Sequence, residues 1–332
     1  MKVFALFGAG RIGRIHAANI AAHAGARLKY VVDVDAAAAA AIAASAGAVV
    51  ADAKSVLSDA GVDALLVASP TDTHAALIEA GGAAGKAILC EKPVDLDVAR
   101  ARAAVAAAER AGILLAIGFN RRYDPSFRRL RDGIDAGEIG AVESVLIVSR
   151  DPSPPPVAYV QRSGGLFRDM TIHDLDMARW LLGEEPVEVT AHGSCLVDPG
   201  IGAAGDIDTA AVTLRSAGGR IAQIANTRRA VFGYDQRIEV CGARGMLAAG
   251  NRRATSVERA TATGYESDPA LPFFLERYAD AYRLELDAFV RRLHGEKSDL
   301  VSGADGVRAL EIADACDRSL RTRATVFLEP RS

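Results

Sequence analysis

The fold of this chain is decided by residues 2–20, which read KVFALFGAGRIGRIHAANI. Residues 2–7 form an apolar run of strand length, and three glycines lead from this run into a segment of helical character. Gly8 permits a tight turn, Gly10 lets the backbone approach a pyrophosphate, and Gly13 allows the helix to pack closely on the strand. The pattern predicts a dinucleotide site formed by Gly8, Gly10, Arg11, Ile12 and Gly13, with a glycine-rich turn that binds no ligand as the alternative.

The next strand-like run, residues 27–34, carries an acid, Asp33, near its end. Asp33 lies 20 residues beyond Gly13, at the position where an acid binds the adenosine ribose hydroxyls. An NADP site needs a cation for the 2′-phosphate, whereas residues 33–36 contain two acids and no base. We therefore expect NAD to be preferred over NADP.

Strands and helices continue to alternate up to about residue 120. This alternation indicates an α/β fold with a doubly wound parallel sheet of Rossmann type. Strand-like runs then follow one another with few helices between them, which indicates an α+β domain with a largely antiparallel open sheet. We predict an NAD-binding domain at 1–120 and a substrate-binding and oligomerisation domain at 121–332. The runs of the second domain lie at 142–149, 186–197, 207–215, 220–227, 236–241 and 245–249, and helices are expected at 168–182, 273–294 and 303–318.

Composition and charge narrow the possible partners. The net charge is −3 and no block of basic residues stands out, so we expect no nucleic-acid partner. Residues 36–51 are apolar but shorter than a membrane span, so no membrane partner is expected either. None of the four cysteines lies in a C-x-x-C pair, which indicates a reducing, cytoplasmic setting and no zinc site.

Two segments carry groups suited to proton transfer. Lys92, in the sequence Glu91-Lys92-Pro93, follows an apolar strand and is expected at the carboxyl edge of the sheet, where ligands bind in such folds. Asp169 and His173 lie four residues apart, so they share one face of a helix. A histidine beside a carboxylate can accept a hydroxyl proton near pH 7. Taken alone, a surface lysine and a surface ion pair remain open alternatives, and a metal pair is less favoured, so we expect no metal.

These motifs together resemble the Gfo/Idh/MocA oxidoreductases over nearly the whole chain. Within that family the chain is most similar to the bacterial inositol 2-dehydrogenases. The matching segments are residues 8–13, the turn 71–74, 91–93, 119–125 (FNRRYDP), 149–152 (SRDP), 164–176 and 233–239 (GYDQRIE).

The resemblance implies roles at matching positions. Lys92 would touch both cofactor and substrate, His173 would accept the proton, and Asp169 would complete the site. Family members are commonly homotetramers that associate through the open C-terminal sheet. The expected reaction is NAD-dependent oxidation of the polyol myo-inositol to its 2-keto product. Further residues are implied at the nicotinamide and at the polyol: Pro70, Thr71, His74 and Glu91 for the cofactor, and Arg121, Asp176 and Tyr234 for the substrate.

Three other functions stay open at this point. The same enzyme could act on scyllo-inositol, chiro-inositol or glucose instead. A non-catalytic NAD-binding sensor would have lost Lys92 or His173, and both are present. A hydrolase that uses bound NAD as a transient hydride carrier would not release NADH.

Overall fold

The structure is a computed structural model that describes residues 1–329 as two compact units. The first unit comprises residues 1–120 together with 281–310. The second comprises residues 121–280 and the C-terminal residues from Glu311 onward. None of the helices in the described part of the chain is long and apolar enough to cross a membrane.

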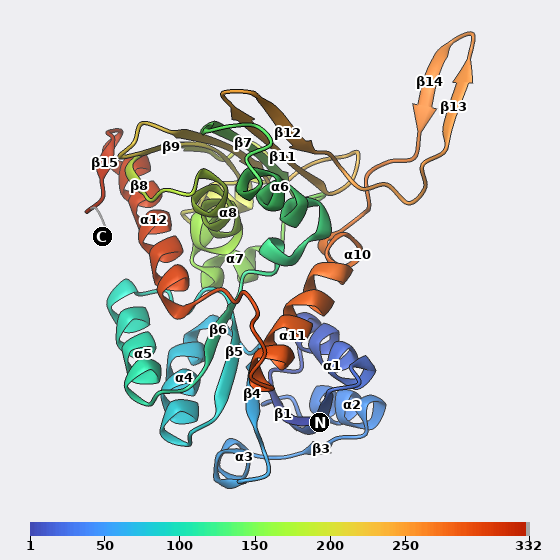
Figure 1. The fold of residues 1–332 in the computed structure, drawn as a ribbon, viewed down its shortest axis with the longest axis vertical. Coiled ribbons are helices and arrows are strands. Elements are labelled where there is room, and N and C mark those ends of the chain that lie inside the picture. Colours follow the sequence, from blue (N-terminus) through green and yellow to red (C-terminus); the bar gives the residue numbers. More distant parts are fainter. Residues whose placement is uncertain (330–332) are drawn as a thin grey trace. The chain divides into compact units, whose positions relative to one another are not determined.

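The first unit is built on a parallel six-stranded sheet with the order β3-β2-β1-β4-β5-β6 (Figure 1). This order confirms the predicted doubly wound sheet, because the strand order reverses at β1, where ligands bind in such sheets. Its elements are β1 (Lys2–Phe7), α1 (Arg11–Ala22), β2 (Ala26–Val32), α2 (Ala36–Ala46), β3 (Val49–Val50), α3 (Ala53–Ser58), β4 (Ala64–Val67), a 3₁₀ turn η1 (Thr71–Thr73), α4 (His74–Ala83), β5 (Ala87–Glu91), α5 (Val98–Arg110) and β6 (Leu115–Gly118).

Helix α11 (Ala279–Leu293) joins this unit from far along the chain. Its apolar side chains Leu286, Phe289 and Val290 belong to the same buried cluster as Phe4 of β1 and Ile20 of α1. Burial of three large apolar side chains stabilises this packing by several kcal/mol, at about 1.5–3 kcal/mol each. The first unit therefore contains residues 281–310 in addition to residues 1–120, so a single boundary at residue 120 does not describe it.

The second unit is built on a seven-stranded sheet with the order β12-β11-β7-β10-β9-β8-β15. Neighbouring strands are antiparallel except β7 and β10, which run parallel, so the predicted largely antiparallel sheet is confirmed. Its strands are β7 (Val142–Arg150), β8 (Pro186–Ser194), β9 (Thr209–Ser216), β10 (Ile221–Thr227), β11 (Asp235–Gly242), β12 (Gly245–Ala249) and β15 (Val326–Phe327).

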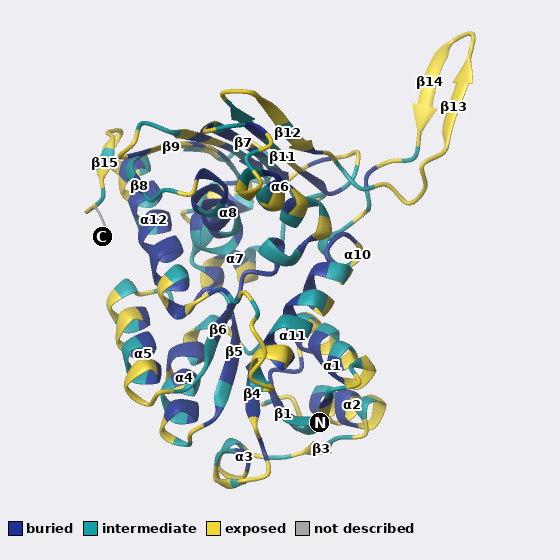
Figure 2. Cartoon of the chain, viewed as in Figure 1, coloured by how far each residue is buried: buried dark blue, intermediate teal, exposed yellow. Residues whose placement is uncertain are grey.

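Burial alternates along these strands with the period of two expected for a half-covered sheet. One face packs on α8, whose buried residues include Leu175 and Leu182. The alternate residues point to the other face and are exposed or half-buried (Figure 2). The helical elements of this unit are η2 (Asn120–Tyr123), α6 (Pro125–Asp135), α7 (Val157–Ser163), a π turn η3 (Phe167–Thr171), α8 (Ile172–Leu182), α9 (Pro199–Ala203) and α10 (Phe274–Arg277). Helix α12 (Gly303–Thr322) begins in the first unit and continues into the second from Glu311 onward.

A two-stranded hairpin, β13 (Glu258–Thr261) and β14 (Gly264–Ser267), projects from the second unit with every strand residue exposed (Figures 1 and 2). The sequence of this segment predicts no strands, because a polar segment without a buried face carries no period-two alternation of apolar and polar residues.

Candidate active site

The glycine-rich loop of the first unit has the shape of a phosphate cradle. Gly8 has φ +102°, and a Cβ at Gly8 would lie 2.4 Å from the Ala68 carbonyl oxygen. A Cβ at Gly13 would lie 2.0 Å from the Gly8 carbonyl oxygen, so only glycine lets α1 pack this closely on the turn. At Gly10, by contrast, a Cβ would meet no atom of the described residues within 4 Å. The open space above Gly10, at the amino end of α1, is where an anionic group can approach the backbone.

Asp33 supports this loop from the end of β2. Its Oδ2 accepts a hydrogen bond from the Ala9 N–H at 2.5 Å, and its Oδ1 accepts one from the Asp35 N–H at 2.8 Å. Asp35 has a different role, because its carboxylate caps α2 by accepting from the N–H groups of Ala37 and Ala38. Of the two acids in this turn, Asp33 is therefore the one placed beside the glycine loop.

The segment that carries Lys92 begins at the carboxyl end of β5. Glu91 is the last strand residue, and the Lys92–Pro93 peptide bond is cis. The buried His74 links this segment to the end of β4, since its Nδ1 lies 2.7 Å from the Pro93 carbonyl oxygen and its Nε2 lies 2.8 Å from that of Ser69. His74 thus connects the loop after β4, which contains the predicted cofactor residues Pro70 and Thr71, to the loop after β5.

In the second unit, charged side chains cluster where the neighbouring strands β7 and β10 end. Because β7 and β10 are parallel, with Arg150 paired to Thr227, the residues that follow them, Asp151 and Arg228, leave the sheet side by side. The buried Arg228 donates to Asp169 Oδ2 at 2.9 Å and to Asp151 Oδ2 at 3.3 Å. The Tyr159 hydroxyl donates to Asp169 Oδ1 at 2.8 Å. The predicted carboxylate Asp169 therefore has both oxygens held by neighbours that the sequence analysis did not single out.

The pKa of Asp151 lies above that of a carboxyl group on the surface. Burial raises its pKa to about 6, with Arg228 opposing the shift and the negative charge of Asp169 adding to it. A carboxyl group whose pKa is raised in the folded state contributes stability below its unfolded pKa of 3.8, and this contribution is lost as the pH rises through about 6.

We expect Asp151→Asn to remove this pH dependence, because the amide does not titrate. Between about pH 4 and about pH 7 the free energy of unfolding of the variant should rise relative to the wild type by up to about 3 kcal/mol, since each pKa unit corresponds to 1.36 kcal/mol. Urea unfolding of both proteins at the two pH values measures this difference. If the variant and the wild type differed in free energy of unfolding by the same amount at both pH values, the raised pKa of Asp151 would be contradicted.

His173 lies at the start of α8, where its neighbour Asp174 is anchored on both sides. Arg121 of η2 lies 2.5 Å from Asp174 Oδ1, and the Asn226 side chain of β10 donates to Oδ2 at 2.8 Å. Burial raises the pKa of Asp174, and Arg121 and Asn226 act against that shift. Because Asp174 is fully buried, this network fixes the first turn of α8 and with it the backbone position of His173.

A second pair repeats the arrangement two residues later. Arg122 makes a bidentate contact with Asp176 at 2.8 and 2.5 Å, and Asp176 is 1% exposed. Two successive arginines of η2 thus hold two acids of α8. Tyr234 is also buried, and its ring edge packs against Tyr278 at 5.9 Å between ring centroids. Substrate contact by Arg121, Asp176 and Tyr234 stays a prediction. In the structure Arg121 is held by Asp174, and Asp176 is held by Arg122.

The predicted residues therefore lie in two groups, one in each unit. The cofactor residues lie at the carboxyl ends of β1, β2, β4 and β5, on the loops there and on the first turns of the helices that follow. Asp169 and His173 lie on successive turns of the second unit, in η3 and α8. Arg228, Asp151 and Tyr159 were missed as site residues. Asp151 stands in the SRDP segment that carries the family resemblance, which was the one available signal.

Comparison with known proteins assigns the chain to a family. Residues 2–119 match the model of the oxidoreductase family with NAD-binding Rossmann fold, and residues 127–248 match the Gfo/Idh/MocA C-terminal domain. The chain belongs to the Gfo/Idh/MocA oxidoreductase family. It is an NAD-dependent oxidoreductase, and the glycine cradle with its open space at Gly10 fits that cofactor.

Individual members of the family resemble the chain over its whole length. It is 50% identical to inositol 2-dehydrogenase of Rhizobium meliloti over 325 residues, covering 98% of each protein. The structure of a myo-inositol dehydrogenase from Corynebacterium glutamicum matches with a TM-score of 0.95 and 42% identity, covering 100% of both chains. Scyllo-inositol dehydrogenase of Lactobacillus casei, solved with NAD(H) and scyllo-inositol, matches with a TM-score of 0.91 and 30% identity, covering 98% of this chain and 99% of that one.

Proposed function

We propose that this protein oxidises the 2-hydroxyl group of myo-inositol to the 2-keto product, with NAD as the electron acceptor. The observation that carries the proposal is the whole-length similarity to an inositol 2-dehydrogenase, in a chain that retains Lys92, Asp169 and His173. Scyllo-inositol is the second candidate substrate, because the chain also resembles a dehydrogenase of that isomer.

Each residue has a defined part in the proposed reaction. His173 accepts the proton of the substrate hydroxyl, and protonated Lys92 stabilises the negative charge that develops on the oxygen. Asp169, held by Arg228 and Tyr159, keeps a fixed negative charge in the site. NAD held by the glycine loop and Asp33 would supply the acceptor for the carbinol hydrogen and its electron pair, which leaves a carbonyl group on the substrate.

Formation of NADH from a panel of inositol isomers and common sugars tests this function. The highest kcat/KM is expected with myo-inositol. A higher value with scyllo-inositol, chiro-inositol or glucose would assign that compound instead. If substrate is consumed without release of NADH, the hydrolase alternative holds.

The choice of NAD over NADP should depend on the turn after β2. Val34 is fully exposed beside Asp33, so a side chain placed there can reach a bound 2′-phosphate. We expect Asp33→Asn with Val34→Arg to raise the NADP/NAD ratio of kcat/KM by about tenfold or more, because a repelling charge is replaced by an attracting one. The control is Asp33→Asn with Val34→Gln. An equal rise in the control would show that the added cation contributes nothing.

We also propose a cytoplasmic homotetramer. The open face of the second unit's sheet supports the assembly, since apolar side chains such as Leu146 and Ile221 are 40% exposed there. Light scattering at a series of concentrations measures the mass directly. The four cysteines are free thiols, which agrees with a reducing compartment.

A further inference from the structure

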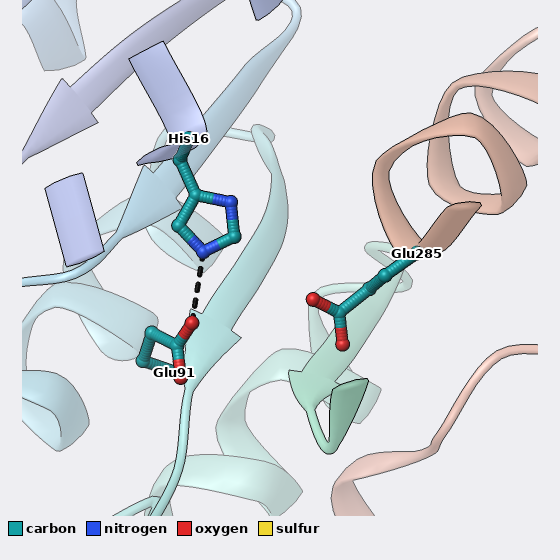
Figure 3. A group of neighbouring side chains, drawn as sticks. All are labelled: His16, Glu91 and Glu285. Carbon is teal, nitrogen blue, oxygen red and sulfur yellow. Dashed lines mark hydrogen bonds and ion pairs between the residues drawn. The ribbon is translucent and has the colours of Figure 1, made fainter. Parts of the chain in front are cut away.

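Three titratable side chains meet inside the first unit, and two of them, His16 and Glu285, have no role in the reaction described above. His16 lies on α1, Glu91 ends β5 and Glu285 lies on α11 (Figure 3). His16 Nε2 lies 2.8 Å from Glu91 Oε1, and the Glu285 carboxylate points toward this pair (Figure 3). His16 and Glu285 are each 1% exposed and Glu91 is 9% exposed.

The cluster is incompletely satisfied. Among the described residues, neither Glu285 oxygen has a hydrogen-bond partner, and neither does His16 Nδ1. One nitrogen or oxygen from each of the three side chains lies within 4.8 Å of the other two. Glu285 makes no direct hydrogen bond to the other two side chains. A spacing of up to 4.8 Å leaves room for one bridging water, because two groups that each bond a water at about 2.8 Å lie about 4.6 Å apart. Buried waters commonly join such otherwise unsatisfied groups.

The electrostatics favour a proton over a metal ion as the neutralising charge. Burial raises the pKa of Glu285 well above its usual value, and the negative charge of Glu91 raises it further. Zinc binds nitrogen and oxygen ligands at about 2.0–2.2 Å. Here His16 Nε2 instead hydrogen-bonds Glu91 Oε1 directly, at 2.8 Å. The groups that face Glu285 are Glu91 from β5 and His16 from α1, whose ring also contacts the edge of Tyr282 on α11.

We propose that Glu285 is a neutral carboxylic acid that donates, through one buried water, to the His16–Glu91 pair and thereby acts as a positioning residue for Lys92. Glu91 directly precedes Lys92, so a fixed Glu91 side chain fixes the strand end from which Lys92 leaves. Strand β6 also packs closely on Glu91, because a Cβ at Gly118 would lie 3.1 Å from Glu91 Oε2. The inference rests on the proposed role of Lys92.

Infrared spectroscopy tests the protonation state without substrate. The wild type at about pH 8 should show the C=O stretch of a protonated, buried carboxyl group, and Glu285→Gln should lack it. Glu109→Gln, at an exposed position of α5 in the same unit, is the matched control and should keep the band. A wild type without the band, or with stoichiometric bound metal by elemental analysis, would overturn the proposal.

Kinetics test the positioning role. Glu285→Met keeps the volume but removes the acid, so kcat should fall by about 10- to 100-fold while the KM for NAD and the melting temperature stay close to wild type. Glu285→Gln retains a neutral donor and should keep most of the wild-type kcat. Equal activity of the Met and Gln variants would contradict the positioning role. A wild type that forms no NADH from any polyol would instead defeat the proposed function and leave the infrared result standing.

Discussion

Replacement of His173 or of Lys92 by alanine is expected to lower kcat by about 10²–10⁴-fold while NAD still binds. The loss follows from the roles of the two groups, since general acid–base assistance contributes about this factor. Binding of NAD should survive in His173→Ala because the glycine loop and Asp33 belong to the first unit, whereas His173 lies in the second. Steady-state kinetics with myo-inositol and fluorescence titration with NADH measure the two effects separately.

Matched controls exist for both variants. His192→Ala alters an exposed histidine of β8, and Lys54→Ala alters an exposed lysine of α3. Both controls should retain the wild-type kcat. A rate within about threefold of wild type in His173→Ala would remove it as the proton acceptor, and the same result in Lys92→Ala would remove that residue from the site.

The regular part of the fold was readable from the sequence because its signals are local. Strands of a parallel sheet are buried on both faces, so β1 and β4 stand out as continuous apolar runs. The strands of the second unit alternate between buried and exposed positions, which is the period that marks a half-covered sheet. The glycine loop could be predicted for the same reason. The glycines for the tight turn, for the approach of the backbone to the pyrophosphate and for helix packing all lie within six residues.

The remaining features depend on which distant segments meet. Helix α11 is amphipathic by its own sequence, but nothing in that pattern indicates that Phe289 packs beside Phe4. In the same way, Arg228 reaches Asp169 and Asp151 only because β7 and β10 lie side by side in parallel. Strand order is a long-range property, so a single sequence does not contain a local signal for it.

The acids of α8 illustrate a related limit. The family resemblance implies a substrate role for Asp176, whereas the sequence singles out no role for Asp174. In the structure both are buried and held by Arg121 and Arg122. A buried carboxylate is tolerated only with such a partner, because an unpaired buried charge is very costly. The partner lies more than 50 residues away, so burial and pairing become visible together, in the structure.

Gly10→Ala is expected to weaken NAD binding by about 10- to 100-fold and to leave the fold intact. A methyl group at Gly10 meets no atom of the described chain within 4 Å, and the backbone there, with φ −71°, suits any residue. The same methyl group would occupy the space through which the pyrophosphate must approach the N–H groups of α1, at a cost of about 1–3 kcal/mol. Calorimetric titration with NAD and a thermal melt of the free protein separate the two effects.

Two further variants decide whether this reading of the loop is right. Gly250→Ala also adds a methyl group in open space, but in the second unit, and should change neither affinity nor stability. Gly13→Ala adds one that would lie 2.0 Å from the Gly8 carbonyl oxygen, so it should lower the melting temperature as well as the affinity. If Gly10→Ala behaved like Gly250→Ala, the space above Gly10 would not receive the pyrophosphate, and the cofactor would have to bind elsewhere in the first unit. If Gly10→Ala lowered the melting temperature as Gly13→Ala is expected to do, Gly10 would be needed for the fold, and the weaker NAD binding would result from the loss of stability.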